Sequence, residues 1–272
     1  MRLTPLFAIV AALPQALAAA PFGLPDGLRQ GALVLGTAPA GTTRLTLDGA
    51  PVAVAPDDRF VIAFDRDARP QALLTATLAD GTTQTATLTI APGDWRIERL
   101  QTLRKIPVPS AEFAAKRSGE LAQIVAARAT DSEADGWRQR FVWPAQGRIS
   151  GLFGAQRIYA GEPGSYHGGV DVAKPEGAEV VAPADGVVTL AADPPFTLEG
   201  RLLILDHGHG VTSAFLHLSR IDVRVGARVR QGQPLGLVGR TGRATGPHLH
   251  WAMTWNGARI DPLLVAGPMP PA

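Results

Sequence analysis

The chain has 272 residues, enough for two domains that each bury a core, and its 46% hydrophobic and 18% charged content is typical of a folded globular protein. The formal net charge is only +2, and no basic run or aromatic-basic interleaving is present, which argues against nucleic acid as a partner. The sequence has no cysteine, so disulfides and lipid attachment to an N-terminal cysteine are excluded, and any metal must be held by histidine and carboxylate side chains.

The first residues, MRLTPLFAIVAALPQALAAA, combine a positive charge at Arg2 with an apolar stretch and a small-residue end. This pattern predicts a secretory signal peptide over residues 1–18, cleaved after Ala18, because Ala16 and Ala18 satisfy the A-x-A rule. The apolar run is interrupted by Pro14 and is too short for a membrane span. We therefore expect an exported protein of the periplasm or cell envelope, with no stable membrane insertion after cleavage.

Residues 19–95 are predicted to form an N-terminal β domain. Short apolar runs alternate with turn signals, and both Asp48-Gly49 and Asp80-Gly81 lie between alternating apolar and polar residues, the strongest short-range signal for a hairpin. Several strands at this spacing favour a small antiparallel sandwich of immunoglobulin-like type. Nothing in the segment has catalytic spacing, so we expect a spacer or a binding module.

A linker that contains a helix is predicted over residues 96–142. Ser110 is placed to cap the N-terminus of a helix in AEFAAKRSGELAQIVAARA. Four apolar residues of this segment have the spacing of one helix face, which predicts a helix that joins the two domains. They are Phe113, Leu121, Ile124 and Val125.

Residues 143–265 are again predicted to be strands and turns, followed by a tail at 266–272. The clearest runs are VVAPADGVVTLA, RLLILDHG, VTSAFLHL and GARVRQGQPLGLVG, and no amphipathic helical pattern interrupts them. We expect an open antiparallel β structure whose loops and strand ends carry a site. The whole chain is therefore predicted to be mostly β.

Histidine motifs in this second β region point to a metal site. In GPHLHWAM, His248 and His250 would lie on one face of a strand, with Cα atoms ~6.5–7 Å apart. Catalytic zinc takes about three protein ligands, and HGGVD supplies two further candidates, His167 and Asp171. A straight strand would hold these two ~13 Å apart, so we expect the two intervening glycines to bend the chain through backbone angles closed to other residues.

The other histidines have different expected roles. His217, in FLHL, ends an apolar run between the two motifs and is a further candidate for the site. In LDHGHG, His207 is expected to be structural, pinning a hairpin or lying near the mouth of the site, and His209 to be solvated. Arg243, in the glycine-rich loop before GPHLHW, is a candidate for contact with a substrate carboxylate.

HGGVD, FLHL and TGRATGPHLHW, in this order on a β-rich background, resemble the motifs of the lysostaphin or LytM-type zinc endopeptidases, a family of peptidoglycan hydrolases. The similarity runs from about residue 143 to Asp261. The resemblance implies a LytM-type catalytic domain with three ligands for Zn²⁺, which are His167, Asp171 and His250. It also implies two catalytic histidines that do not bind the metal, His217 and His248.

The expected mechanism depends on these two histidines. No H-E-x-x-H helix is present, so another group must take the proton of the attacking water, and histidine titrates in the right range for this task. We expect His248 to orient and deprotonate the water and His217 to hydrogen-bond the oxyanion or the leaving nitrogen. The sequence alone does not decide which of the two histidines has which role. The family often has tyrosine at the position of Phe215 and glutamate at the position of Ala252. Loss of such a glutamate, whose carboxylate would lie around the metal ligands without binding the metal, would weaken metal binding or activity by about 10–100-fold.

The leading hypothesis is an exported zinc endopeptidase that hydrolyses peptide cross-links of bacterial peptidoglycan, with peptide stems or cross-bridges as its substrates. The alternative is a non-catalytic peptidoglycan-binding regulator that activates other cell-wall hydrolases, with an envelope protein as partner. A third hypothesis, a biotin- or lipoyl-carrying domain, fails because such a domain needs a lysine at a tight turn. The lysines here, Lys105, Lys116 and Lys174, lie elsewhere.

Overall fold

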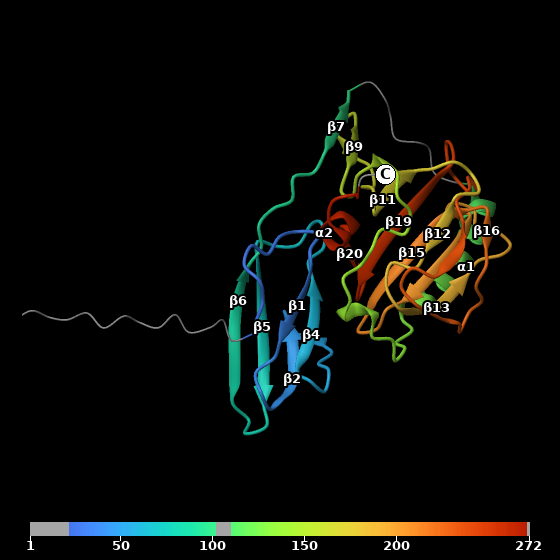
Figure 1. The fold of residues 1–272 in the computed structure, drawn as a ribbon. Helices are drawn as coiled ribbons and strands as arrows, with labels where there is room; N and C mark the ends of the chain where they lie inside the picture. Colours follow the sequence, from blue (N-terminus) through green and yellow to red (C-terminus); the bar gives the residue numbers. More distant parts are fainter. Residues whose placement is uncertain (1–21, 102–109, 271–272) are drawn as a thin grey trace, which may run out of the picture.

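The computed structural model describes residues 22–101 and 110–270, so the predicted signal peptide at residues 1–18 lies outside the described part. Two β-rich parts are joined by a segment that contains one long helix (Figure 1). The mostly β fold predicted from the sequence is confirmed. Of the helices in the described ranges, none has the length and apolar character needed to cross a membrane.

The N-terminal domain consists of two small antiparallel sheets. One pairs β1 (Leu33–Thr37) with β4 (Arg59–Ala63), and the other has the order β3-β2-β5-β6. The bounds of the second sheet are β2 Thr42–Leu47, β3 Ala50–Val52, β5 Gln71–Leu78 and β6 Thr83–Thr89. Both predicted hairpins are present, and at the first of them Asp48 and Gly49 have φ of 49° and 82°, the left-handed pair that a two-residue turn of this kind requires.

Helix α1 (Ala111–Arg128) begins as predicted but faces the domain with different residues. Ser110 caps it, because the Ser110 side-chain oxygen accepts a hydrogen bond of 3.2 Å from the amide of Phe113. Of the predicted face, Ile124 is buried, whereas Leu121 and Val125 are 44% and 66% exposed. The predicted helix face is therefore wrong in part.

Two charged residues of α1 set the rotation of the helix. Arg117 donates to both carboxylate oxygens of Glu199 at 2.6 Å, and Glu120 accepts a 2.7 Å hydrogen bond from the amide of Thr197. Charged groups can be buried only when they are paired in this way. These bonds turn Arg117, Glu120 and Ile124 toward the sheet, which leaves the neighbouring Leu121 and Val125 in solvent.

The C-terminal domain is built on an antiparallel sheet of order β17-β13-β14-β15-β19-β11-β8, in which β20 also pairs with β19. Its strands are β8 Arg148–Gly151, β11 Val170–Ala173, β13 Gly186–Ala191, β14 Arg201–Asp206, β15 Val211–Leu218, β17 Arg228–Val229, β19 His248–Trp255 and β20 Ala258–Ile260. A smaller sheet has the order β12-β18-β16, with bounds Glu179–Val181, Pro234–Leu237 and Arg220–Ile221. The open antiparallel architecture is as predicted, but the short helices η1 (Gly136–Arg138) and α2 (Pro262–Ala266) are not anticipated by the sequence pattern.

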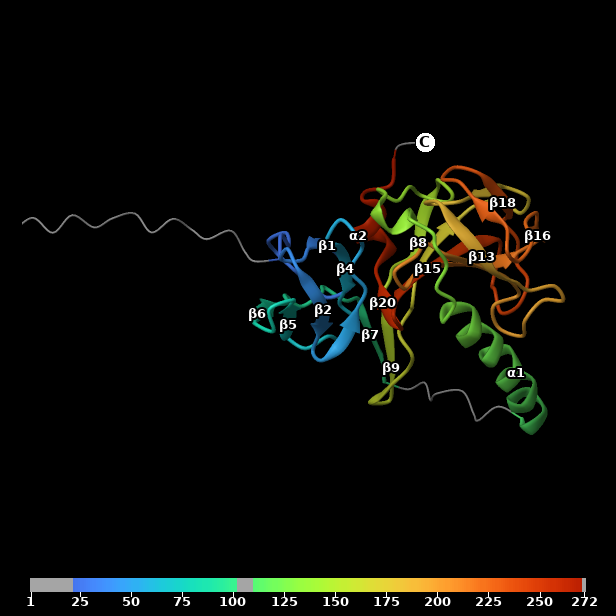
Figure 2. The same cartoon turned by 90° about the horizontal axis from the view of Figure 1, so that it is seen from below.

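The two domains share one continuous hydrophobic core. Within the segment expected to be a linker, β7 (Ile97–Leu100) pairs in parallel with β9 (Gln156–Tyr159), which also pairs with β10 (Glu162–Pro163). Trp95 packs edge to face on Phe153, with ring centroids 5.5 Å apart. Figure 2 shows the N-terminal domain and α1 against different sides of the C-terminal domain.

Candidate metal and catalytic site

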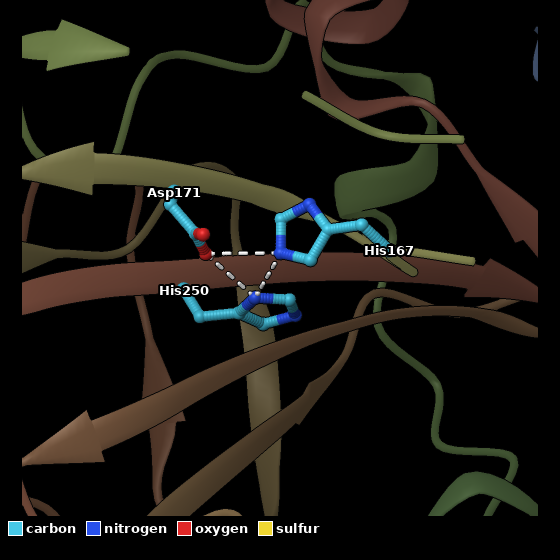
Figure 3. Close-up of side chains that lie close together, drawn as sticks. All are labelled: His167, Asp171 and His250. Atoms are coloured by element: carbon cyan, nitrogen blue, oxygen red, sulfur yellow. Dashed lines mark hydrogen bonds and ion pairs between the residues drawn. The ribbon is translucent and has the colours of Figure 1, made fainter. Parts of the chain in front are cut away.

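Three candidate ligands converge where β11 and β19 pair (Figure 3). Asp171 on β11 lies directly opposite His250 on β19, and His167 comes from the segment just before β11. His167 Nε2 lies 3.1 Å from Asp171 Oδ1 and 3.0 Å from His250 Nδ1, and the last two atoms are 2.8 Å apart. The structure therefore brings together all three residues predicted to bind a metal.

The bend predicted before β11 is present, but its cause differs from the one expected. The left-handed backbone angles of the described residues do not include Gly168 or Gly169. Instead, a Cβ atom on Gly169 would lie 2.4 Å from the carbonyl oxygen of Trp251 and 2.8 Å from His250 Nε2. Glycine is needed because β19 passes too close for any side chain, and this close approach is what brings the ligands together.

The hydrogen bonds around the cluster favour a bound cation. His167 Nδ1 lies 3.0 Å from the carbonyl oxygen of Leu152, and since a carbonyl only accepts, Nδ1 carries the hydrogen and Nε2 keeps its lone pair. Burial alone would raise the pKa of Asp171, but its close contacts with the rings of His167 and His250 hold that pKa below its ordinary value. The cluster thus has an ionised carboxylate and at least one ring lone pair turned toward a common point.

The spacing of the three ligand atoms also fits a metal ion. In a tetrahedral site with bonds of about 2.0–2.1 Å, as zinc has, neighbouring ligand atoms lie about 3.3 Å apart. The three distances here are 2.8, 3.0 and 3.1 Å, so a small outward movement would accommodate the ion. Two imidazoles and one carboxylate are a donor set that leaves a fourth position for water.

His217 and His248 form a second pair beside the cluster, with ring centroids 4.8 Å apart. Nδ1 of His217 donates to the carbonyl oxygen of Thr241 at 2.9 Å, and Nδ1 of His248 donates to that of Gly246 at 2.8 Å. Each neutral ring therefore presents the lone pair of Nε2. Nε2 of His248 lies 3.7 Å from Asp171 Oδ1, which places it next to the candidate ligands.

His217 reaches the site through an unusual backbone conformation. Its φ is 64°, which is costly for a residue other than glycine and is often found at functional sites. Neighbouring residues of a regular strand point to opposite faces, yet Leu216 and His217 both line the same groove. Burial lowers the pKa of His217 to about 4, so the ring is neutral at pH 7.

The histidines open into a groove of about 380 Å³. Besides Leu216 and the five site residues, it is lined by two loop segments, residues 198–199 and 243–245. These loops are joined, because the amide of Arg243 donates to the carbonyl oxygen of Leu198 at 2.9 Å. The structure places the exposed Arg243 in the groove, as its proposed contact with a substrate requires, whereas the carboxylate of Glu199 is occupied by Arg117.

The two remaining histidines lie outside the site. His207 is fully buried, with Nδ1 2.7 Å from the carbonyl oxygen of Asp185 and Nε2 2.9 Å from Ser213 Oγ, so its role is structural. The prediction that His209 is solvated is wrong. Its ring stacks on Trp137 with centroids 4.2 Å apart, and its Nδ1 atom is buried.

The two departures from the family pattern have structural explanations. Phe215 is fully buried in the main core, where its ring packs without a polar partner. Ala252 lies in a small cluster beneath α1, together with Ile124 and Ala127. A glutamate here would direct a carboxylate into apolar contacts, which is costly. The small side chain at position 252 is therefore suited to the packing of α1.

Sequence reasoning missed one glycine that shapes the cluster of candidate ligands. A Cβ atom on Gly151 would lie 2.3 Å from Asp171 Oδ2 and 3.1 Å from His167 Cε1. Gly151 belongs to no histidine motif, and it approaches the cluster only because β8 pairs with β11. No signal in the sequence identifies it, since the register of that pairing is not a local property.

Comparison with known proteins agrees with this geometry. The model of peptidase family M23 matches residues 165–262, which lie within the C-terminal domain. A solved structure of a Pseudomonas aeruginosa protein assigned to peptidase M23 is 29% identical with a TM-score of 0.69, covering 89% of this chain and 96% of that one.

Two curated relatives match a shorter part of the chain. ShyA of Vibrio cholerae serotype O1, a peptidoglycan DD-endopeptidase, is 36% identical over 132 residues, which are 48% of this chain and 30% of the relative. Mpg of Neisseria meningitidis serogroup B, a DD-carboxypeptidase/endopeptidase, is 39% identical over 123 residues, 45% of this chain and 28% of the relative. The matched parts are thus less than a third of these relatives.

Proposed function

We propose that the protein is a zinc endopeptidase that hydrolyses peptide bonds in the cross-links of bacterial peptidoglycan. The observation that carries the proposal is the convergence of His167 Nε2, Asp171 Oδ1 and His250 Nδ1 within 2.8–3.1 Å, beside two histidines with Nε2 lone pairs. The match to the M23 family model and the names of the relatives ShyA and Mpg support both the reaction and the substrate. An exported protein of the cell envelope would meet this substrate.

When bound, zinc supplies Lewis-acid chemistry, which polarises a carbonyl and lowers the pKa of a water molecule to about 7. His167, Asp171 and His250 would hold the ion. Nε2 of His248 is the base in this proposal, because it lies 3.7 Å from Asp171 Oδ1 and is free to accept the proton of the attacking water. His248 then gives this proton to the leaving nitrogen, so the C–N bond breaks and the products are a carboxylic acid and an amine.

His217 has a different role in this proposal, although its ring packs against that of His248 with centroids 4.8 Å apart. Its ring centroid lies 6.3 Å from that of His250, and its Nδ1 hydrogen is held by the carbonyl oxygen of Thr241. A neutral His217 accepts at Nε2, and it becomes a donor to an oxyanion only after it receives a proton. We assign it to orienting the reacting groups beside His248.

The groove suits an extended peptide better than a compact ligand. Two loop segments line it beside the site residues, and one uncompensated charge, that of Arg243, lies on it among the described lining residues. A guanidinium in this position binds a carboxylate of the substrate well. Peptide stems carry such carboxylates, which is the second reason to propose them as substrate.

The test is mass analysis of purified peptidoglycan incubated with the protein, with zinc or with a chelator. Cross-linked dimers should become monomers only with zinc, and His217→Ala and His250→Ala should abolish the conversion. His209→Ala is the matched control, because it removes a histidine outside the site and should retain activity. If the zinc-loaded protein binds peptidoglycan but leaves every cross-link intact, the proposal is overturned in favour of a non-catalytic regulator.

A further inference from the structure

The metal ligand His167 is held by a loop rather than by the central sheet. Its amide donates to the carbonyl oxygen of Ala155 at 2.8 Å, its own carbonyl accepts from the amide of Gly154 at 2.9 Å, and its ring Nδ1 donates to Leu152 at 3.0 Å. Every one of these partners lies in residues 152–155. The position of the His167 ring therefore follows the position of that short segment.

The N-terminal domain holds this segment through a buried arginine. Arg66 is only 7% exposed, and its Nε donates to the carbonyl oxygen of Gly154 at 3.1 Å. Its Nη2 donates to Gln156 Oε1 at 3.0 Å, and the amide nitrogen of Gln156 in turn donates to the carbonyl oxygen of Gly164 at 2.7 Å. One side chain from the N-terminal domain thus holds the first end of the β9–β10 hairpin directly, and the second end through Gln156.

A second set of contacts holds the residue next to His167. The hydroxyl of Tyr166 donates to Asp65 Oδ1 at 3.1 Å, and the guanidinium of Arg66 lies over the Tyr166 ring at 4.8 Å. Oδ2 of Asp65 accepts from the amide of Arg259 at 2.7 Å, and the Arg259 guanidinium lies 5.0 Å from the centre of the same ring. Tyr166 is therefore fixed from the N-terminal domain and from β20 at once.

We infer that Asp65 and Arg66 are positioning residues for the metal ligand His167, so that the N-terminal domain is a fixed component of the metal site. The inference rests on the proposed function only in assigning His167 as a ligand. It gives the N-terminal domain a role that differs from a spacer or a binding module. Groups that orient a ligand from behind typically change metal affinity by about 10–100-fold.

The structure offers a matched control at a second contact between the domains. Arg138, on η1, donates to both carboxylate oxygens of Asp57 at 2.7 and 3.0 Å. This pair joins the same two domains but has no hydrogen bond to residues 152–167. Asp57→Asn therefore weakens the contact between the domains without altering the segment that holds His167. Asp65→Asn alters both the contact between the domains and that segment.

The experiment measures Zn²⁺ affinity of the full-length protein by competition with a chromophoric chelator, and records the visible spectrum of the Co²⁺-loaded protein. Arg66→Gln, Asp65→Asn and Tyr166→Phe should each weaken zinc binding by about 10–100-fold and alter the cobalt spectrum. Asp57→Asn should leave both measurements unchanged. Arg66→Lys, which keeps one donor for Gly154, should recover part of the affinity.

Thermal melts of the zinc-free proteins identify variants that fail to fold, and if Arg66→Gln is one of them, Tyr166→Phe and Asp65→Asn decide. Folded variants that bind zinc as tightly as the unaltered protein overturn the inference, and so does an equal loss in Asp57→Asn. Hydrolysis of peptidoglycan is not part of the readout. An unaltered protein that binds zinc but cuts no cross-link would overturn the proposed function and leave this inference standing.

Discussion

Replacing Gly151 by alanine should weaken metal binding without altering any ligand. The added Cβ atom would lie 2.3 Å from Asp171 Oδ2 and 2.9 Å from Asp171 Cγ. An ordinary contact needs about 3.5 Å, so the carboxylate must move by about 1 Å. Metal–ligand distances tolerate only about 0.2 Å. We therefore expect zinc affinity to fall by about 10–100-fold, equivalent to about 1.4–2.8 kcal/mol.

A chelator competition assay on Gly151→Ala measures this loss directly, and Gly246→Ala is the control. Gly246 lies in the loop before β19, but a Cβ atom there meets nothing within 4 Å, so that variant should bind zinc like the unaltered protein. Circular dichroism establishes that both variants are folded. Equal zinc affinities for the two variants would refute the argument that space beside Asp171 limits the site.

Three further outcomes are expected. Ile124→Ala should lower the free energy of unfolding by about 2–5 kcal/mol, because it leaves a cavity beneath α1. Val125→Ala, at a position 66% exposed, should change the free energy of unfolding by less than about 0.5 kcal/mol. Urea unfolding compares the two variants, and equal losses would contradict the observed helix face. Burial lowers the pKa of His207 from 6.5 to about 4, so between these pH values the unfolded chain binds a proton that the folded chain does not. The free energy of unfolding should therefore fall by about 1.4 kcal/mol per pH unit as the pH decreases from about 6.5 to 4. His207→Gln should remove this contribution from the pH profile of stability. Zinc at about 100 times its Kd should add about 2.7 kcal/mol to the free energy of unfolding, an increment that His250→Ala should lose in melts with and without chelator.

Strand alternation made part of the site predictable. His248 and His250 share a face because β19 is regular over this stretch, and both line the groove. His217 could not be placed in the same way. In a regular strand it would point with Phe215 into the core, and only its left-handed backbone turns it to the groove. A list of motifs identifies the residue but does not reveal this conformation.

The orientation of α1 shows a second limit of sequence reasoning. Apolar spacing alone favours Leu121 and Val125 as inward residues, yet they lie in solvent. The deciding contacts join Arg117 to Glu199, 82 residues away, and Glu120 to Thr197. Periodicity counts apolar side chains, whereas these buried charges acquire their partners only after the chain has folded.

The continuous core has a practical consequence for expression of the C-terminal domain alone. A fragment starting at residue 143 would lose Trp95 from the ring of Phe153 and Arg66 from the ring of Tyr166. It would also lose β7, which leaves one edge of β9 without its partner. Exposed aromatic rings and an unpaired strand edge favour association between molecules. Such a fragment should aggregate more readily than the longer chain, even though it contains every histidine of the site.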